Sequence, residues 1–489
     1  MRDAVLAEKL HSVLVRLIGL GTFLLFTMVL LVNLGADFTE FTWKKNFLLP
    51  NIVLIVAAGV AWYAVVRVGR GSGSDSAENS AMDTAISKPS RVWPIALCTV
   101  LLFFLQLWIC YSIFFETGWD PAAVTAEVRN IIENRGINWQ WYFQAYPNNL
   151  TLAQAEYWIL RVDHALNLFC GDYELMAVAA VNCGLSSMSC MLVYFLARRL
   201  FQGDARLPWM LWGLSVLLIG LSPWMVVAYT DSMGLIFPVL CLFLYLHLIH
   251  VKASWGKFFG WPFLLILGYC GYRIKPQAMI MLIAIGIAEL LRNLRVHAVG
   301  KTEKRKKLFG VLIVLMIFGI AVMEIRREQN DWRDSRGFVA DNEKSMDPLH
   351  YLNMGLNTEQ DGAFLQSDLD RSAKFDTRAE RDRYNLQSAR NRIRAMGPVG
   401  LLKHLARKMM VVYADGTFAW GCEPDFWQTK LPEPNGITAR FLREFYYEDG
   451  VYYRLFETME QALWIFILVG CWISSFQFMK DSRKRNVHH

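Results

Sequence analysis

Long apolar runs separated by shorter polar connections are the main pattern along this chain. Ten of these runs approach or reach the roughly 20 residues that an α-helix needs to cross a hydrocarbon layer of about 30 Å. The runs cover residues 12–34, 47–67, 92–114, 175–198, 207–225, 232–250, 258–272, 277–291, 307–324 and 460–479. The pattern predicts an all-α polytopic membrane protein with about ten transmembrane helices.

The lengths of individual runs refine this expectation. Residues 258–272 and 277–291 are short for complete crossings, which predicts broken helices or a pair that meets at the external surface. The run at 12–34 is long, lacks a small-residue cleavage pattern and is soon followed by a second run. We therefore expect it to stay in the membrane rather than to be removed as a signal peptide.

Changes in composition divide the chain into five predicted parts. A stretch rich in Gly, Ser and Asp follows the second run, and this composition is typical of a flexible linker. Two further polar segments are too long to be simple turns, so function is expected to lie in them. The parts are a two-helix membrane preamble at 1–69, a flexible cytoplasmic linker at 70–91, a membrane core at 92–324 with an external loop at 115–174, a small, mostly helical extracytoplasmic domain at 325–459, and a last helix with a basic cytoplasmic tail at 460–489.

Composition and charge agree with a membrane location. Hydrophobic residues make up 54% of the 489 residues and charged residues 19%, so lipid is expected to cover part of the surface. Lys and Arg concentrate in alternate connections, from the N-terminus to the C-terminal tail, which predicts that both termini are cytoplasmic. The net charge of +7 is therefore attributed to topology and to attraction toward membrane lipid, not to nucleic acid.

The nine cysteines do not indicate a disulfide framework. Most of them fall inside apolar runs, where thiols behave as small buried hydrophobic groups. Cys170 and Cys422 lie in the two segments expected outside the membrane, and they would form a disulfide if the fold brought them within bonding distance. Such a bond would attach the second external segment to the first.

Asp120 is the first candidate for chemistry, because it follows the third apolar run by only a few residues. Pro121 suits the first turn of a helix, so Asp120 is expected to be held at the membrane surface. One interpretation is a helix N-cap, in which the carboxylate accepts hydrogen bonds from backbone amides. The other is a general base that orients a hydroxyl nucleophile at the mouth of a membrane cavity. The two roles are compatible.

A second helix is predicted in the same external loop. Thr151 and Gln154 have the spacing of a capping box, and the helix that they begin is expected to run to Phe169. Arg161 and Asp163 would be costly in the middle of a bilayer, so we expect this helix to lie flat at the interface.

Three charged residues interrupt the membrane core at its predicted external end. Asp231 begins the sixth run, whereas Arg273 and Lys275 lie between the seventh and eighth runs. Cations in a short external loop run against the usual charge distribution, which suggests an anionic lipid headgroup as their partner. Ordinary surface charges with apolar stems are the alternative.

The second external segment carries few signals of known chemistry. Helices are expected at about 377–395 and 397–412. The DLD sequence at 368–370 resembles a metal-binding DxD motif, but no nucleotide-binding pattern accompanies it, so a chance match is favoured. The sequence contains no HExxH, paired CxxC, Ser elbow or P-loop. A divalent metal is therefore neither indicated nor excluded.

Several motifs together resemble a known family. WDPAAV follows the third run, and YPNNLTLAQAEYWIL, YTDSMG and GYRIKP come after it in this order. LHYLNMGLNTEQDGAF and KMMVVYADGTF lie in the second external segment. In order and placement these motifs resemble the GT-C membrane glycosyltransferases of Gram-positive bacteria, relatives of the protein O-mannosyltransferases. The resemblance covers roughly residues 92–479 and leaves out the first two helices.

This resemblance implies transfer of a sugar from a polyprenyl-phosphate carrier to an acceptor on the outer face, with inversion at the anomeric carbon. Asp120 then matches the acidic residue of the first external loop. Arg273 and Lys275 would bind the carrier phosphate, and Asp231 would support acceptor binding or hold a metal. A lipid-linked donor also agrees with the lack of a nucleotide-binding motif, because nucleotide sugars are not expected outside the membrane.

Other residues in the resembling motifs concern the acceptor. His350, Asn353 and Asn357 would form a lid or a sugar-recognition edge, and packing within the external domain explains them equally well. Asp120 is followed by Pro instead of a second acid, and the His-Pro-Pro motif of the protein O-mannosyltransferases is missing. The expected acceptor is therefore a cell-envelope glycan, a teichoic acid or a glycolipid, and not a protein.

Two other classes of protein fit parts of the pattern. A transporter or flippase of polyprenyl-linked sugars would also need cations for a phosphate, but transporters usually show repeated halves and polar residues near the midplane. We find no internal repeat, and the notable charges gather at one predicted face. A non-catalytic membrane protein that binds wall polymer is the third alternative.

Overall fold

A computed structural model describes residues 2–36, 47–71, 92–169, 171–201, 205–251, 253–295, 301–420, 427–430 and 436–484. The helices are α1 (Arg2–Ala36), α2 (Asn51–Gly71), α4 (Trp93–Ile113), α5 (Trp119–Ile132), α6 (Gln140–Ala145), α7 (Asn149–Leu166), α8 (Met176–Leu200), α9 (Arg206–Ser215), α10 (Thr230–Gly234), α11 (Ile236–Leu248), α12 (Ser254–Ile274), α13 (Met279–Arg295), α14 (Lys301–Ser335), α15 (Pro348–Met354), α16 (Gln366–Ala373), α17 (Arg378–Tyr413), α18 (Ile437–Tyr446) and α19 (Tyr453–Lys484). Short helices of other types are η1 (Gly171–Tyr173), η2 (Val216–Gly220), η3 (Pro223–Val226) and η4 (Pro276–Ala278). Strands β1 (Phe115–Thr117) and β2 (Trp427–Lys430) form an antiparallel pair.

All ten predicted apolar runs fall on these helices. Within the described residues, seven helices are long and apolar enough to cross a membrane. Shorter apolar helices are Asn51–Val65 in α2 and Arg206–Gly220, which joins α9 and η2. Helix α12 has 21 residues but is less apolar, because it includes Lys257 and Arg273. No residue of the most apolar stretch of α14 is buried by the rest of the protein, so lipid is the natural cover for that surface.

The fifth apolar run, 207–225, is broken in the structure. Helix α9 passes into the π-helix η2 and then into the 3-10 helix η3, which begins at a proline. Backbone groups released by this break are satisfied by two buried amides. Gln106 Nε2 donates to Gly220 O (2.7 Å), and Asn182 Nδ2 donates to Met225 O (2.9 Å). Irregular backbone is tolerated here because protein side chains replace the missing helical hydrogen bonds.

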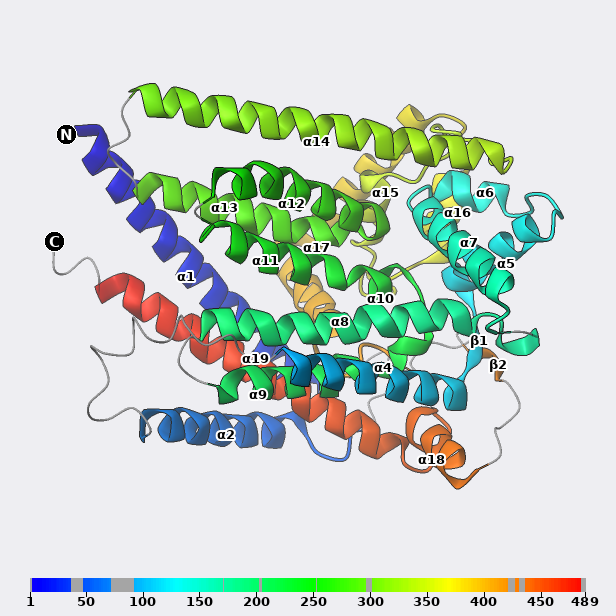
Figure 1. The fold of residues 1–489 in the computed structure, drawn as a ribbon, viewed down its shortest axis with the longest axis horizontal. Helices are drawn as coiled ribbons and strands as arrows, with labels where there is room; N and C mark the ends of the chain where they lie inside the picture. Colours follow the sequence, from blue (N-terminus) through cyan, green and yellow to red (C-terminus); the bar gives the residue numbers. More distant parts are fainter. Residues whose placement is uncertain are drawn as a thin grey trace.

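The helices form a bundle whose two ends differ. Figure 1 shows the N- and C-termini together at one end, whereas α5, α6 and α7 lie with β1 and β2 at the opposite end, which we call the distal end. An apolar core at the distal end joins α4, α8, α18 and α19 around the fully buried Trp420. A second core holds α5 against α7 through Val124, Val128 and Leu160.

The predicted preamble is not a separate unit. Helices α1 and α2 pack against the last helix, α19. Three fully buried amides join them: Asn51 Nδ2 donates to Asn33 O (2.8 Å), and Gln461 Nε2 donates to Asn51 Oδ1 (2.7 Å). Asn33 Nδ2 and Gln461 also bind carbonyl groups at the end of α17. The first two helices therefore belong to the same packed structure as the C-terminal half.

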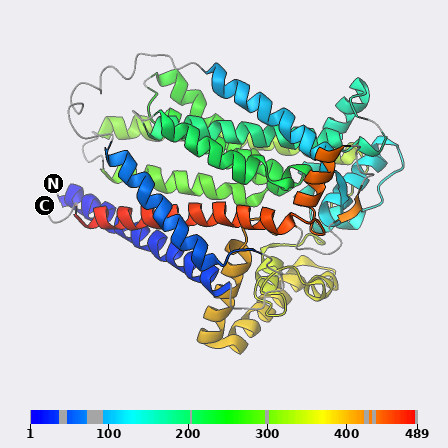
Figure 2. The ribbon, with the colours of Figure 1, turned by 90° about the horizontal axis from the view of Figure 1, so that it is seen from below.

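The polar segment at 325–459 contains several short helices and one long one. Figure 2 shows α15, α16 and α17, coloured yellow to gold, standing out from one side of the bundle. Helix α17 spans both predicted stretches and bends at Gly397, where φ is 62° and Pro398 follows. Further along, α18 packs on α4, with Arg443 Nε donating to Ser112 O (2.8 Å). This segment is thus tied back to the membrane helices.

Candidate functional site

Asp120 lies at the distal end, in the first turn of α5. Strand β1, immediately before it, pairs with β2, in the register Phe115 opposite Lys430 and Thr117 opposite Trp427. The prediction that Asp120 is the N-cap is wrong, because Gly118 is the N-cap residue and no side chain caps the helix. Trp119 has φ of 60°, a conformation that bulky residues rarely adopt, and it turns the chain between the strand and the helix.

The exposed carboxylate of Asp120 accepts a hydrogen bond from a partly buried phenol. Tyr229 Oη donates to Asp120 Oδ2 at 2.9 Å. Tyr229 precedes α10, and its backbone N–H donates to Ser232 Oγ (3.1 Å), so the sequence YTDS fixes its direction. Burial, followed by the charge of Asp120, raises the pKa of Tyr229, which keeps the phenol protonated as a donor.

Two more tyrosines, from different elements, lie close enough to Asp120 for its charge to act on them. Tyr142 of α6 is buried, and burial and then the charge of Asp120 raise its pKa. Tyr351 of α15 is 45% exposed, and burial of its ring and then Asp120 raise its pKa to about 12. Asp120 therefore lies within a group of phenols contributed by α6, α15 and the segment before α10.

Asp231 and Lys275 meet next to this group. Lys275 Nζ contacts Asp231 Oδ2 at 2.6 Å and lies 6.0 Å from the centre of the Tyr229 ring. A Cβ atom at Gly234 would lie 3.2 Å from Lys275 Cβ, so glycine allows α10 to approach the lysine closely. The ring of Tyr229 thus lies beside the Asp231–Lys275 ion pair, and its hydroxyl binds Asp120.

Arg273 points to different partners from Lys275, although only two residues separate them. Arg273 Nη2 donates to Thr151 Oγ1 (3.2 Å), and its guanidinium lies 5.8 Å from the centre of the Tyr269 ring. Arg326 Nε of α14 donates to Tyr269 Oη (3.1 Å). Among the described residues, Arg273 Nη1 is buried without a hydrogen-bond partner. Two cations therefore share Tyr269 where α12 and α14 approach each other.

The predicted capping box of α7 is wrong. Helix α7 begins at Asn149, and its N-cap residue is Asn148. Thr151 instead accepts hydrogen bonds from Arg273 and from Gln329 Nε2 (2.9 Å), and Gln154 donates to Glu328 Oε1 (2.9 Å). Thr151 and Gln154 therefore attach α7 to α12 and α14. They bind these tertiary partners instead of capping their own helix.

His350, Asn353 and Asn357 do not face Asp120. Their exposed fractions are 1%, 1% and 2%. His350 Nδ1 lies 2.8 Å from Ser372 Oγ, Asn353 Nδ2 donates to Asn385 Oδ1 (3.1 Å), and Asn357 Nδ2 donates to Met354 O (2.7 Å). The prediction of a sugar-recognition edge is therefore corrected, because burial and internal hydrogen bonds assign all three side chains to packing. Tyr351, their neighbour on α15, is the side chain near Asp120.

The DLD sequence is not arranged as a metal site. Asp368 is 1% exposed, and its two carboxylate oxygens accept hydrogen bonds from Arg392 at 2.6 and 2.8 Å. Throughout the described ranges, no group of three or more His, Cys, Asp or Glu side chains is arranged to hold a metal ion. Cys170 and Cys422 lie outside the described residues, as does most of the predicted linker at 70–91.

This arrangement can support proton transfer next to an anion. Asp120 Oδ2 accepts from Tyr229, and the carboxylate is exposed, so it can accept a proton from a bound hydroxyl group. Lys275 supplies a positive charge beside the same tyrosine, and Asp231 neutralises part of it. A carboxylate base and a nearby cation are thus held together by one aromatic ring.

Comparison with known proteins assigns a family. A family model described as a conserved hypothetical integral membrane protein matches residues 22–485. This chain belongs to that family. It is accordingly an integral membrane protein, as its apolar helices predicted. No curated protein and no solved structure matches the chain.

The tyrosines were missed in the analysis of the sequence. Tyr142, Tyr229 and Tyr351 occur within or beside the motifs that were singled out, but tyrosine is common at membrane interfaces for reasons unrelated to chemistry. Arg326 was also missed, because it follows the apolar run 307–324 within a charged stretch of α14. A usable signal was the repeated occurrence of Tyr next to the polar motif residues, in AYTDS and LHYLN.

Proposed function

We propose that this membrane protein is an inverting glycosyltransferase that moves a sugar from a polyprenyl-phosphate carrier to a cell-envelope glycan, teichoic acid or glycolipid. The observation that carries the proposal is the Asp120 carboxylate, which is exposed at the distal end and oriented by the partly buried Tyr229 phenol. Such an arrangement suits a general base that acts on a sugar hydroxyl.

The proposed reaction uses this geometry. Asp120 accepts the proton of the acceptor hydroxyl while that oxygen forms a bond to the anomeric carbon of the donor sugar. The bond from the anomeric carbon to the phosphate oxygen breaks, and its electron pair leaves with the carrier phosphate. Attack opposite the leaving group inverts the anomeric carbon. The hydrogen bond from Tyr229 holds Asp120 in one orientation throughout.

The carrier phosphate is assigned to the end of α12. Lys275 lies beside Tyr229, and Arg273 and Arg326 share Tyr269. Fixed cations stabilise the negative charge that grows on a leaving phosphate, because the water displaced there would otherwise have to reorganise. Arg326 is thus added to the predicted pair, and Asp231 acts by positioning Lys275.

The same proposal fixes a topology. Both termini and the basic connections are placed in the cytoplasm of a cell membrane, and the distal end outside. We propose that each of the ten apolar runs spans the bilayer. Residues 325–459 then form the extracytoplasmic segment. The separation of the termini from α5–α7 in Figure 1 supports this arrangement.

The first test is sugar transfer by the purified full-length protein. A panel of radiolabelled polyprenyl-phosphate sugars is offered with crude cell-wall polymer to the wild type and to Asp120→Asn. We expect label to move to polymer with the wild type, and a loss of roughly a hundredfold or more in the variant, because the base is removed. Undiminished transfer by Asp120→Asn contradicts the assignment. Label that stays on the lipid with every donor favours a flippase or a polymer-binding protein.

Tyr229→Phe tests the orienting hydrogen bond. The variant keeps the ring beside Lys275 but loses the donor to a charged group, so kcat is expected to fall roughly tenfold while donor KM changes little. Tyr452→Phe is the matched control, because Tyr452 packs against Phe441 and belongs to another part of the molecule. Equal kcat for the two variants would remove Tyr229 from the proposal.

A further inference from the structure

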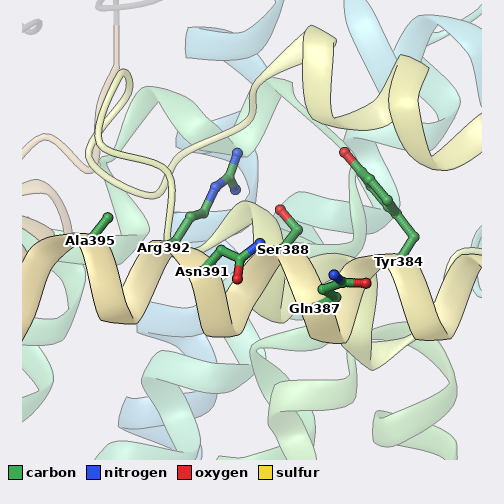
Figure 3. A pocket seen from close by; sticks show the side chains of 6 residues that line it. All are labelled: Tyr384, Gln387, Ser388, Asn391, Arg392 and Ala395. Atoms are coloured by element: carbon green, nitrogen blue, oxygen red, sulfur yellow. The ribbon is translucent and has the colours of Figure 1, made fainter.

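A cavity of about 560 Å³ lies on the first half of α17, and none of the steps above uses it. Its lining side chains occupy one face of the helix, as Figure 3 shows. They are Tyr384, Gln387, Ser388, Asn391, Arg392 and Ala395, and we call this surface the groove. From its first to its last residue the groove follows about 16 Å of helix axis, which suits a chain of sugars better than a single ion.

The groove offers hydrogen-bonding groups that nothing else occupies. Gln387, Ser388 and Asn391 have no hydrogen-bond partner in the part of the chain that the structure describes. Amides and hydroxyls both donate and accept, as sugar hydroxyl groups do. Tyr384 is held against Phe375, with ring centres 5.1 Å apart, and it provides an apolar surface at one end. These are the elements of a carbohydrate site.

Unpaired positive charge borders the groove. Residues 383–395 include four arginines and no acidic residue. Arg392 is bound to Asp368, but Arg383, Arg390 and Arg394 are exposed and have no ion pair among the described residues. Their spacing of seven and four residues places them in one row, next to Gln387 and Asn391. The bound glycan is therefore expected to be anionic.

The two halves of α17 differ in a way that argues against a lipid partner for the groove. Beyond the bend at Gly397, large apolar side chains such as Val399, Leu402 and Val412 are 61% to 69% exposed, as suits contact with lipid. In 383–395 the one exposed large apolar side chain is Ile393. The polar half is thus built for a soluble polyanion.

We propose that the groove binds an anionic glycan, a polysaccharide that carries phosphate or carboxylate groups. Arg392 connects the groove to α15 through Asn353 O, and Tyr351 of α15 lies near Asp120. Under this proposal, a polymer bound in the groove extends past α15 toward the carboxylate of Asp120. This role as an acceptor site rests on the proposed function, whereas glycan binding by the groove does not.

The test measures binding without any donor, so it is independent of sugar transfer. Full-length protein in neutral detergent is titrated with purified phosphate-containing wall polymer, with a neutral glucan, with inorganic polyphosphate and with nanodiscs of anionic lipid. The wild type is expected to bind the wall polymer most tightly. Arg390→Gln combined with Arg394→Gln should weaken this binding roughly tenfold, whereas the exposed control Lys374→Gln should change it less than about twofold.

A second variant separates glycan recognition from charge alone. Gln387→Ala combined with Asn391→Ala keeps every charge, so it should lower affinity for the wall polymer by roughly tenfold and leave polyphosphate binding unchanged. Equal affinity of the wild type for polyphosphate or for anionic nanodiscs would overturn the proposal. Wild-type affinity for wall polymer in both double variants would also overturn it.

Discussion

At the scale of single residues, burial decides the state of several ionisable groups near α5 and α7. Glu156 of α7 is 1% exposed, and burial raises the pKa of its carboxyl to about 8. Thr125 Oγ1 lies 2.9 Å from Pro121 O and 3.2 Å from Glu156 Oε2. The Thr125 hydroxyl can donate to Pro121 O or to Glu156 Oε2, so it links the two helices. The protonated carboxyl thus completes the contact between the two helices.

This protonation predicts a pH dependence of stability. The folded state retains a proton on Glu156 between the ordinary pKa of 4.5 and about 8, so the free energy of unfolding falls as pH rises through this interval. Glu156→Gln keeps a neutral side chain and should lose this dependence. Relative to the variant, the wild-type melting temperature should fall by roughly 2 °C or more between about pH 5 and about pH 8.

Differential scanning fluorimetry of the two proteins checks the prediction. Glu359→Gln is the control, because it removes an exposed carboxylate and should follow the wild type. Parallel melting curves for the wild type and Glu156→Gln over this pH interval would show that Glu156 is ionised in the folded protein.

At the scale of elements, ion pairs and short strands set the positions of helices that have little apolar contact. Helix α16 is short and mostly polar, and it is held to α17 by the two-fold contact between Asp368 and Arg392. The pairing of β1 with β2 acts similarly on the chain before Asp120. A buried pair of this kind fixes one arrangement, because removal of one partner leaves a charge without compensation.

Asp368→Asn tests whether the DLD sequence stabilises or binds metal. The variant leaves Arg392 without its counter-charge and should destabilise the α16–α17 contact by about 3 kcal/mol or more. Protease should then cleave residues 360–395 faster than in the wild type. Asp370→Asn is the matched control, because Asp370 is exposed and only accepts from Gln366. If Mn²⁺ protected the wild type and neither variant, the structural role would be wrong.

At the scale of the whole molecule, buried amides connect parts that are distant in the sequence. Gln461 of α19 donates to Asn51 of α2 and accepts from Gly416 N at 2.7 Å. Asn33 of α1 joins the same network through Asn51. Burying a polar side chain costs free energy unless the side chain is hydrogen-bonded. Each of these amides therefore keeps its partners in place.

Gln461→Leu should therefore weaken the attachment of both N-terminal helices. The variant removes the hydrogen bonds that Gln461 makes with Asn51 Oδ1 and Gly416 N, at about 1–3 kcal/mol for each buried group. We expect a lower melting temperature and faster amide hydrogen exchange in α2 than in the wild type. Gln477→Leu, an exposed change on the same helix, serves as the control. Unaltered exchange in α2 would mean that apolar packing alone attaches the preamble.

The sequence by itself determined where helices form and which class of protein this is. An apolar run of sufficient length favours one helix, because a helix satisfies its own backbone groups and the rest of the chain is not needed for that choice. The division of 377–412 into two helical stretches was also predicted, and the structure bends α17 where Gly397 and Pro398 lie. Among the candidate site residues, Asp120, Asp231 and Lys275 were found from their positions at the ends of apolar runs.

Only the tertiary structure decided which of these residues meet. Tyr229 reaches Asp120 across 109 positions of the sequence, and Lys275 reaches Asp231 across 44. His350 occurs in a motif as suggestive as that of Asp120, but the packing of α15 turned it inward. Such pairings depend on how helices cross and which faces they bury, and periodicity along one helix carries no information about the face that its neighbour presents.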